Sequence, residues 1–180
     1  MASKTLRIGD AMPVFTGLPG ADGKQYSDRD FAGADVLVVV FSCNHCPYVQ
    51  AYEGRMVDLQ GRYAARGVRL VAVNSNETVN YPEDNFNEMV KRAKDQGFNF
   101  AYLRDEDQKA AGAFGATHTP EFFVFDKARK LRYHGKMDDN WKEPGSVKEH
   151  YLRDAVESVL KGTAVAVPET FSIGCTIKWK

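Results

Sequence analysis

The hydrophobic pattern along the chain predicts strands and helices in alternation. Residues 36–41, VLVVVF, are continuously apolar and mostly β-branched, as in a central strand that is covered on both faces. Apolar residues then recur every three or four positions, which places them on one face of a helix that Gly67 ends as a C-cap. They are Val49, Tyr52, Met56, Leu59 and Tyr63.

The same reasoning predicts the remaining elements. Further strands are expected at residues 16–18, 24–26, 68–73, 99–103, 122–125 and 131–134. Further helices are expected at residues 81–96, 106–114 and 146–161. The dipeptide Asp22-Gly23 predicts a hairpin turn between the first two strands, and the spacing of Ser146 to Glu149 fits a capping box at the start of the last helix.

This order of elements predicts an α/β fold. Strand–helix–strand units require right-handed crossovers and parallel strands, whereas the late hairpin at residues 122–134 adds antiparallel strands. We therefore expect a mixed central β-sheet flanked by helices on both faces, with an N-terminal β-hairpin extension. No repeat or linker interrupts the chain, so residues 1–180 are predicted to form one domain, with residues 163–180 as a C-terminal tail.

Composition and charge narrow the class of partner. Lys plus Arg and Asp plus Glu number 24 each, so the chain has no global basic field for nucleic acid or an anionic membrane. The amino end lacks the apolar core of a secretory signal, and the longest apolar run, Val36–Phe41, is too short to cross a bilayer. With 3 cysteines, a structural disulfide framework is not expected. We expect a cytoplasmic protein, although an exported form that had lost its leader would look the same.

Two cysteines, Cys43 and Cys46, stand where the strand at residues 36–41 gives way to the first helix. If the helix begins near Asn44, Cys43 lies at its N-terminus, where the helix dipole stabilises a thiolate. Cys46 follows one turn later and could resolve a mixed disulfide formed at Cys43. His45, if protonated, would lower the thiol pKa further. This pattern predicts a redox pair in which Cys43 attacks and Cys46 resolves.

Two other interpretations of the pair stay open. The cysteines could be buried structural residues. Alternatively, Cys43, His45 and Cys46 could bind zinc or copper, with Cys175 as a further sulfur ligand. A second Cys-x-x-Cys or a paired-histidine motif, which metal sites of this kind usually carry, is not found in the sequence.

With the segment 117-THTPEFF-123, the sequence resembles the thioredoxin-like superfamily, in the redoxin branch of alkyl hydroperoxide reductase and thiol-specific antioxidant proteins. The resemblance spans about residues 7 to 162. The matching positions are Gly9, Pro13, Phe15, Asp22-Gly23, Cys43-Asn44-His45-Cys46 and Thr119-Pro120. The resemblance implies that Pro120 is cis and packs beside the thiols, and that the backbone of Thr119 pairs with a bound substrate strand.

Departures from the family pattern bear on the chemistry. Ordinary thioredoxins carry a buried acid where this chain has Leu37, so the proton acceptor for Cys46 would be another group, such as Glu121 or water. Peroxiredoxins show Pro-x-x-x-Thr-x-x-Cys, and neither cysteine has that threonine and proline before it. The motif therefore favours disulfide exchange over peroxide reduction.

Cys175 lies in the tail, where apolar residues alternate with polar ones as in a strand. It could be a small buried hydrophobic residue. Related redoxins carry a similar terminal Gly-Cys-x-Ile-Lys-Trp, however, and a tail folded back over the pair would make Cys175 a third redox thiol.

We therefore predict a thiol:disulfide oxidoreductase that uses a Cys43/Cys46 dithiol–disulfide couple. Its partners would be protein or small-molecule disulfides and a thiol electron donor, without nucleic acid or membrane, in a monomer or homodimer. The thiols would cycle with no bound cofactor and no metal. A thiol-dependent peroxidase is the alternative, with a sulfenic acid at Cys43. From another class, the alternative is a copper- or zinc-binding protein on the same fold.

Overall fold

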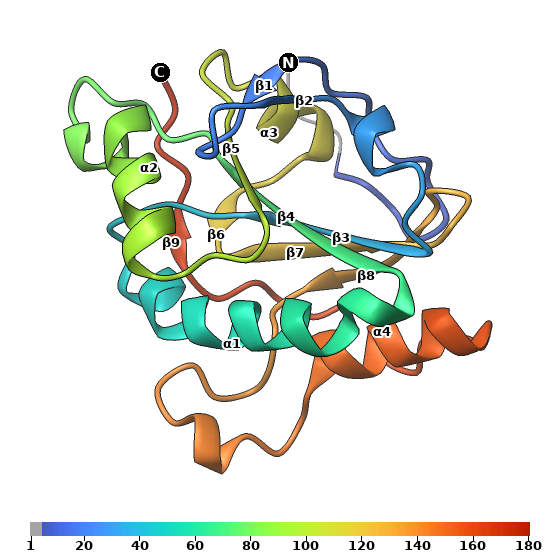
Figure 1. The fold of residues 1–180 in the computed structure, drawn as a ribbon. Coiled ribbons are helices and arrows are strands. Elements are labelled where there is room, and N and C mark those ends of the chain that lie inside the picture. The colour runs from blue at the N-terminus through green and yellow to red at the C-terminus, as the bar shows by residue number, and fades with distance from the viewer. Residues whose placement is uncertain (1–4) are drawn as a thin grey trace.

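The computed structural model describes residues 5–180, and a five-stranded sheet lies at its centre (Figure 1). The strand order is β5-β4-β3-β7-β8. Strands β3, β4 and β5 run parallel, β7 pairs antiparallel with β3, and β8 pairs antiparallel with β7. The predicted mixed sheet is confirmed. The strands are β3 (Val36–Phe41), β4 (Val68–Asn74), β5 (Ala101–Arg104), β7 (Glu121–Phe125) and β8 (Leu131–Gly135).

Helices cover both faces of this sheet, as expected. Helices α1 and α4 run along one face, and α3 lies on the other (Figure 1). The α-helices are α1 (Pro47–Tyr63), α2 (Phe86–Asp95), α3 (Lys109–Phe114) and α4 (Tyr151–Lys161). Short 3-10 helices are η1 (Asp28–Phe31), η2 (Ala64–Arg66), η3 (Pro82–Asp84) and η4 (Pro144–Ser146).

Strand β3 divides the core into two halves. Val36, Val38 and Val40 pack with the apolar faces of α1, α2 and α4, because alternate residues of a strand face opposite sides. The intervening residues, including Leu37, pack on the opposite side with α3. All six residues of β3 are at most 1% exposed, as the continuous apolar run predicts. The strand is therefore packed on both faces, and most residues of the loop that follows it, 42–46, are also buried.

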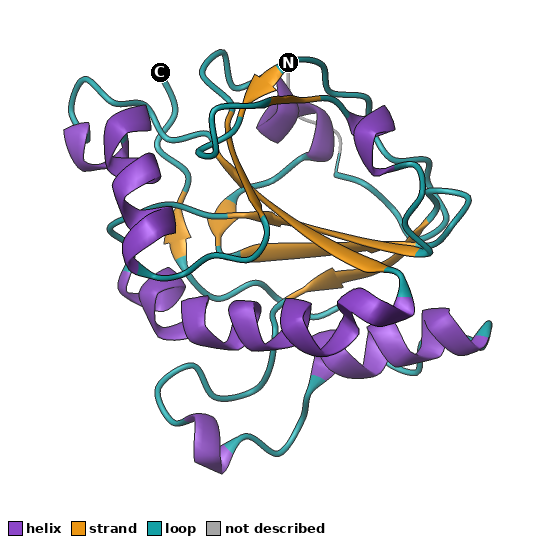
Figure 2. Cartoon of the chain, viewed as in Figure 1, coloured by secondary structure: helices purple, strands orange, loops and turns teal. Residues whose placement is uncertain are grey.

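Two small sheets flank the central one (Figure 2). Strands β1 (Leu18–Pro19) and β2 (Gln25–Tyr26) form the predicted N-terminal hairpin, with Gly23 at φ 85° in the turn. Strands β6 (His118–Thr119) and β9 (Cys175–Thr176) pair antiparallel, and this second pair joins the tail to the middle of the chain.

The starts of all four predicted helices are wrong. The third helix, α3, begins at Lys109 and not at residue 106. Helix α1 begins at Pro47 and not near Asn44. The second helix is divided into η3 and α2, because the Asn85 side chain accepts a hydrogen bond from the Glu88 backbone and starts a new helix there. The last helix begins at Tyr151, since the segment around Ser146 forms η4 instead.

The predicted strand pattern of the tail holds over a short stretch only. Strand β9 contains two residues, and Ile177 next to it is buried against the core. Phe171, expected on the same apolar face, is 92% exposed. The tail thus packs on the rest of the protein at Cys175 and Ile177, whereas Phe171, before them, is exposed to solvent.

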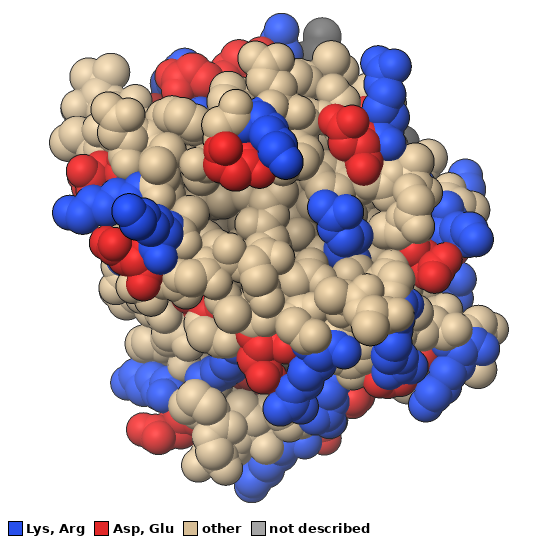
Figure 3. All heavy atoms as spheres, in the orientation of Figure 1, with Lys and Arg blue, Asp and Glu red and all other residues tan. Residues whose placement is uncertain are grey.

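Acidic and basic side chains are interspersed on the face shown in Figure 3, in line with the balanced charge of the sequence. In residues 5–180 no helix has the length and apolar character needed to span a bilayer.

Candidate active site

The two cysteines of the pair occupy different positions relative to α1. Cys46 is the N-cap residue of the helix, and Cys43 lies in the loop between β3 and the helix. The expectation that Cys43 stands at the helix N-terminus is therefore wrong. Pro47 fills the first helical position, where the missing N–H costs little, and this fixes the helix start three residues later than predicted.

Thr119 and Pro120 lie against both sulfurs. The Thr119–Pro120 peptide bond is cis, as the resemblance implied, and both residues are buried. The Sγ atom of Cys43 is 3.5 Å from the Thr119 hydroxyl, and the Sγ atom of Cys46 is 3.4 Å from the Thr119 carbonyl oxygen. The site thus joins the start of α1 to the turn before β7.

The tail brings the third cysteine to the same place. Cys175 pairs with Thr119 across β6 and β9, and its Sγ atom lies 2.7 Å from Sγ of Cys46. That separation exceeds the disulfide bond length of about 2.05 Å, so the two thiols are in contact and not bonded. Gly174 makes this approach feasible, because a Cβ atom there would lie 2.0 Å from the Thr119 oxygen.

The three thiols hold their protons to different degrees. The pKa of Cys46 is lowered because the Cys43 thiol hydrogen-bonds to it; Cys175 adds to the effect, whereas burial opposes it. The same hydrogen bond raises the pKa of Cys43 well above the ordinary value, together with burial and the negative charge of Asp84. Burial and the neighbouring Cys46 raise the pKa of Cys175 to about 11. Of the three cysteines, Cys46 is therefore the one whose thiolate form the site favours, and the helix dipole acts in the same direction.

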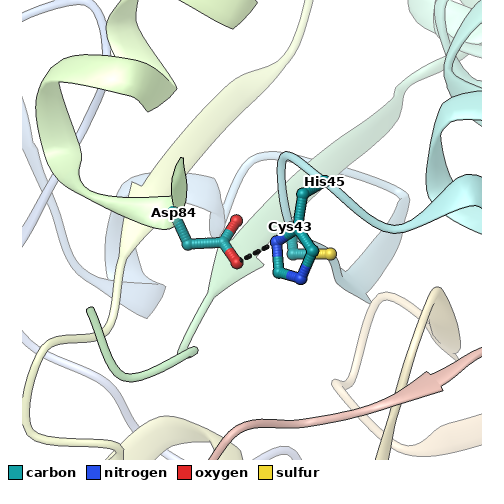
Figure 4. A group of neighbouring side chains, drawn as sticks. All are labelled: Cys43, His45 and Asp84. Atoms are coloured by element: carbon teal, nitrogen blue, oxygen red, sulfur yellow. Dashed lines mark ion pairs between the residues drawn. The ribbon is translucent and has the colours of Figure 1, made fainter. Parts of the chain in front are cut away.

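The side chain of His45, between the two cysteines, points toward Asp84, which comes from η3 (Figure 4). The Nδ1 atom of His45 is 2.5 Å from the Asp84 carboxylate, and the ring of His45 stacks on Tyr81. The backbone N–H of Asn44 donates to the same carboxylate at 2.6 Å. Asp84 is 0% exposed, so its charge acts in a medium where water screens little.

Asp84 is the residue that sequence reasoning missed. Glu121, expected as a proton acceptor, accepts hydrogen bonds from Thr117 and lies 3.6 Å from His134. Asp84 falls in the first turn of the helix that the sequence predicts at residues 81–96. Pro82 begins the short helix η3 that ends at Asp84, and no local pattern of the sequence signals that this carboxylate is buried.

The atoms of Cys43, His45 and Asp84 that could bind a metal lie within 4.8 Å of one another. The predicted further ligand, Cys175, contacts Cys46 instead. Asp84 already accepts hydrogen bonds from three neighbouring donors besides its contact with His45; they are Asn44, Asn74 and Asn76. Because the Asp84 carboxylate already accepts these hydrogen bonds within the chain, the group of Cys43, His45 and Asp84 fits a zinc or copper ion poorly.

Known proteins resemble this chain over most of its length. The profile of the AhpC/TSA family matches residues 8–134. A crystal structure of a hypothetical protein from Sinorhizobium meliloti is 38% identical, with a TM-score of 0.90 over 99% of this chain and 97% of that one. A solution structure of a thioredoxin-like protein is 19% identical and superposes with a TM-score of 0.70 over 88% of this chain and 99% of that one, which bears on the fold alone.

Two curated relatives carry functional names. Thiol-disulfide oxidoreductase ResA of Bacillus thuringiensis is 27% identical over 129 residues, which cover 70% of this chain and 68% of that protein. A protein of Mycobacterium tuberculosis named "Putative peroxiredoxin" is 29% identical over 116 residues, covering 63% of this chain and 68% of that protein. With the family match, the mixed sheet and the cis-proline beside the cysteines, the chain belongs to the AhpC/TSA family and has a thioredoxin-like fold.

Proposed function

We propose that this protein is a thiol–disulfide oxidoreductase in which Cys46 is the nucleophile. The observation that carries the proposal is the position of Cys46: it caps the N-terminus of α1 and lies in contact with a second thiol, with its own pKa lowered. A thiolate is the reacting form of cysteine in disulfide exchange. The similarity to the thiol-disulfide oxidoreductase ResA supports the same class of reaction.

The reaction exchanges one disulfide for another. The Cys46 thiolate attacks a substrate disulfide, forms a mixed disulfide and expels the first substrate thiolate, which takes up a proton. A second protein thiol then attacks the Cys46 sulfur and releases the other half of the substrate as a thiol. The substrate gains two electrons, the protein becomes a disulfide, and an external thiol restores it. This cycle needs no bound cofactor, since sulfur carries the electrons.

Neighbouring residues set the roles of the two cysteines. The hydrogen bond to Cys46, burial and the nearby charge of Asp84 raise the pKa of the Cys43 thiol, so Cys43 keeps its proton and can donate it toward Cys46. The attacking thiol in this proposal is therefore Cys46 and not, as expected from sequence, Cys43, because the helix N-terminus belongs to Cys46. Thr119 and Pro120 pack beside both sulfurs, but the backbone of Thr119 pairs with Cys175, so a substrate strand could bind there only in place of the tail.

The test is trapping on the reduced protein with 2-hydroxyethyl disulfide, followed by mass spectrometry of the intact chain. We expect Cys46→Ser to form no mixed disulfide at Cys43 under conditions where the wild type loses two thiols per chain. Cys43→Ser should still react through Cys46. If the Cys46→Ser variant forms a mixed disulfide at Cys43 and the Cys43→Ser variant does not react, the attacking thiol is Cys43, as the sequence predicted.

A thiol peroxidase is the second candidate, supported by the family match and the relative named as a peroxiredoxin. In that reaction the Cys46 thiolate attacks a peroxide oxygen, yielding a sulfenic acid and an alcohol or water, and a second thiol then condenses with it. Parallel assays of the same protein with hydrogen peroxide and with 2-hydroxyethyl disulfide separate the two candidates by their relative second-order rate constants.

A further inference from the structure

Neither sulfur of the Cys43/Cys46 pair is open to solvent. Cys43 is 1% exposed and Cys46 is 0% exposed, whereas Cys175 is only partly buried and lies in contact with Cys46. A pair that exchanges directly with external disulfides needs at least one sulfur that a partner can reach. In this arrangement the sulfur nearest to solvent belongs to the tail.

The tail is held on both sides of Cys175. Downstream, the Ile177 backbone donates to the Thr117 carbonyl oxygen at 2.9 Å, and its side chain is buried. Upstream, the Thr170 backbone donates to the His134 carbonyl oxygen at 3.0 Å. The intervening segment includes Phe171, which is 92% exposed. Cys175 therefore sits between two anchors and itself pairs with Thr119, so it separates from Cys46 when this one strand pairing opens, without release of the whole tail.

We propose that Cys175 is the resolving thiol for Cys46, that the oxidised protein carries a Cys46–Cys175 disulfide, and that the external thiol reductant enters at the Cys175 sulfur. This inference rests on the proposed function, because it requires Cys46 to be the nucleophile. The contact of 2.7 Å, the strand pairing with Thr119 and the close approach at Gly174 carry it.

In the oxidative half of the cycle, two electrons pass from the protein thiols to the substrate disulfide. Because Cys46 is 0% exposed and lies in contact with Cys175, the Cys175 sulfur must first move away from it. The Cys46 thiolate then breaks the substrate disulfide and forms a mixed disulfide, and the first substrate thiolate leaves and takes a proton. The Cys175 thiol loses its proton to that thiolate or to water, and its sulfur attacks Cys46. The second substrate thiolate leaves and is protonated. The substrate has gained two electrons, and Cys46 and Cys175 have lost them in forming one bond.

In the reductive half, an external thiolate attacks the Cys175 sulfur and Cys46 leaves as a thiolate. The sulfur with the lowered pKa is the better leaving group. Attack at Cys175, which is less buried than Cys46, is therefore favoured by both access and leaving-group chemistry. A second molecule of external thiol attacks the resulting mixed disulfide and forms the small-molecule disulfide. Cys175 returns to its thiol form, and the site is ready for another substrate.

Cys43 fits a different role. Its thiol hydrogen-bonds to Cys46, it is buried, and Asp84 raises its pKa, so it is a poor attacking group in the folded protein. By donating to Cys46 it favours the Cys46 thiolate. We assign Cys43 as a positioning residue for the Cys46 thiolate.

The experiment identifies the disulfide that turnover produces. Reduced wild-type protein is treated with 2-hydroxyethyl disulfide, quenched in acid, alkylated and digested without reduction, and the linked peptides are identified by mass spectrometry. We expect a 46–175 link, with Cys43 alkylated. The Cys43→Ser variant should still yield the 46–175 link, and Cys175→Ser should accumulate the mixed disulfide at Cys46 at least tenfold over wild type. Thr176→Ala, on the same strand, should match wild type.

A 43–46 link in the wild type, with Cys175 alkylated, would overturn the inference while leaving the proposed function intact. If no variant forms a mixed disulfide at Cys46, the proposed function itself fails. A second measurement needs no variant: the oxidised wild type is mixed with a limiting amount of thionitrobenzoate, and we expect the label on Cys175. A label on Cys46 would contradict the proposal that the external thiol attacks the Cys175 sulfur.

Discussion

At the scale of single residues, the buried carboxylate of Asp84 influences which cysteine keeps its proton. Its oxygen atoms meet His45 and the Asn44 backbone, and its negative charge is one cause of the raised pKa of Cys43. Because Asp84 is fully buried, nearby water cannot weaken this effect. The carboxylate thus acts on the thiols without touching a substrate.

We predict that Asp84→Asn lowers the pKa of Cys43, since one of its causes is removed. The measurement is ultraviolet thiolate absorbance against pH in a Cys46→Ser/Cys175→Ser background, where Cys43 is the remaining cysteine of the chain. The same change should cost about 2 kcal/mol of stability, because an amide cannot accept all the hydrogen bonds that the carboxylate does.

Glu83→Gln is the matched control for that variant. Glu83 neighbours Asp84 in the chain and its carboxylate lies 3.8 Å from His45, but its side chain is 47% exposed. Solvent screening should leave the Cys43 titration unchanged there. Equal shifts in the two variants would show that burial of the charge is not the source of the effect.

At the scale of elements, the tail strand β9 acts as a cover on the site. Its backbone pairs with the edge of β6, and the absence of a side chain at Gly174 permits the approach to Thr119. Pairing along a free strand edge is the general way in which an extended segment is bound. The tail therefore occupies the edge beside the cis-proline that an external strand would need.

We predict that Gly174→Ala weakens tail docking and exposes Cys46. The added Cβ atom would lie 2.0 Å from the Thr119 carbonyl oxygen, so the backbone of one strand must move. Alkylation of reduced Cys46 by iodoacetamide should become at least tenfold faster. Gly33→Ala is the control, since a Cβ atom there meets nothing within 4 Å. Equal alkylation rates in both variants would argue against a cover formed by β9.

The elements were predictable where a local pattern decided them. The apolar run at residues 36–41 and the five-residue stripe of α1 became buried as the sequence indicated. Helix starts were predicted less well, because they depend on which side chain finds a backbone N–H in three dimensions. The Asn85 side chain caps α2, whereas α1 starts at Pro47 after an N-cap residue, Cys46, that makes no side-chain cap hydrogen bond, and neither start follows from hydrophobic spacing.

At the scale of the whole molecule, the site joins segments that are far apart in the chain. Local motifs gave the cysteine pair and Thr119-Pro120. The contact between Cys46 and Cys175 spans 129 positions, and Asp84 reaches the cysteines through the packing of η3. Such contacts depend on tertiary packing and carry no local signature, so the alternatives for Cys175 could not be decided from sequence.

The stability of the whole fold should depend on pH differently in the reduced and the oxidised protein. The folded protein lowers the pKa of Cys46, so the reduced form gains stability at alkaline pH and loses it as pH falls through the folded pKa. The oxidised form has no thiol at Cys46 and lacks this dependence. The stability advantage of the oxidised form should therefore increase as pH falls from 7.5 to 5.5, by up to about 1.4 kcal/mol per pH unit.

Chemical denaturation of the oxidised and reduced wild type at both pH values measures this difference, and other titrating groups cancel in the comparison. Cys43 and Cys175, whose pKa values are raised, stay protonated in this range in the folded and unfolded states and add nothing. Loop closure adds a constant that does not depend on pH: about 5 kcal/mol for a loop of some 130 residues, against about 2 for a Cys43–Cys46 loop. If the difference in free energy of unfolding between the oxidised and reduced protein stays constant with pH, Cys46 is not the thiolate of the folded protein.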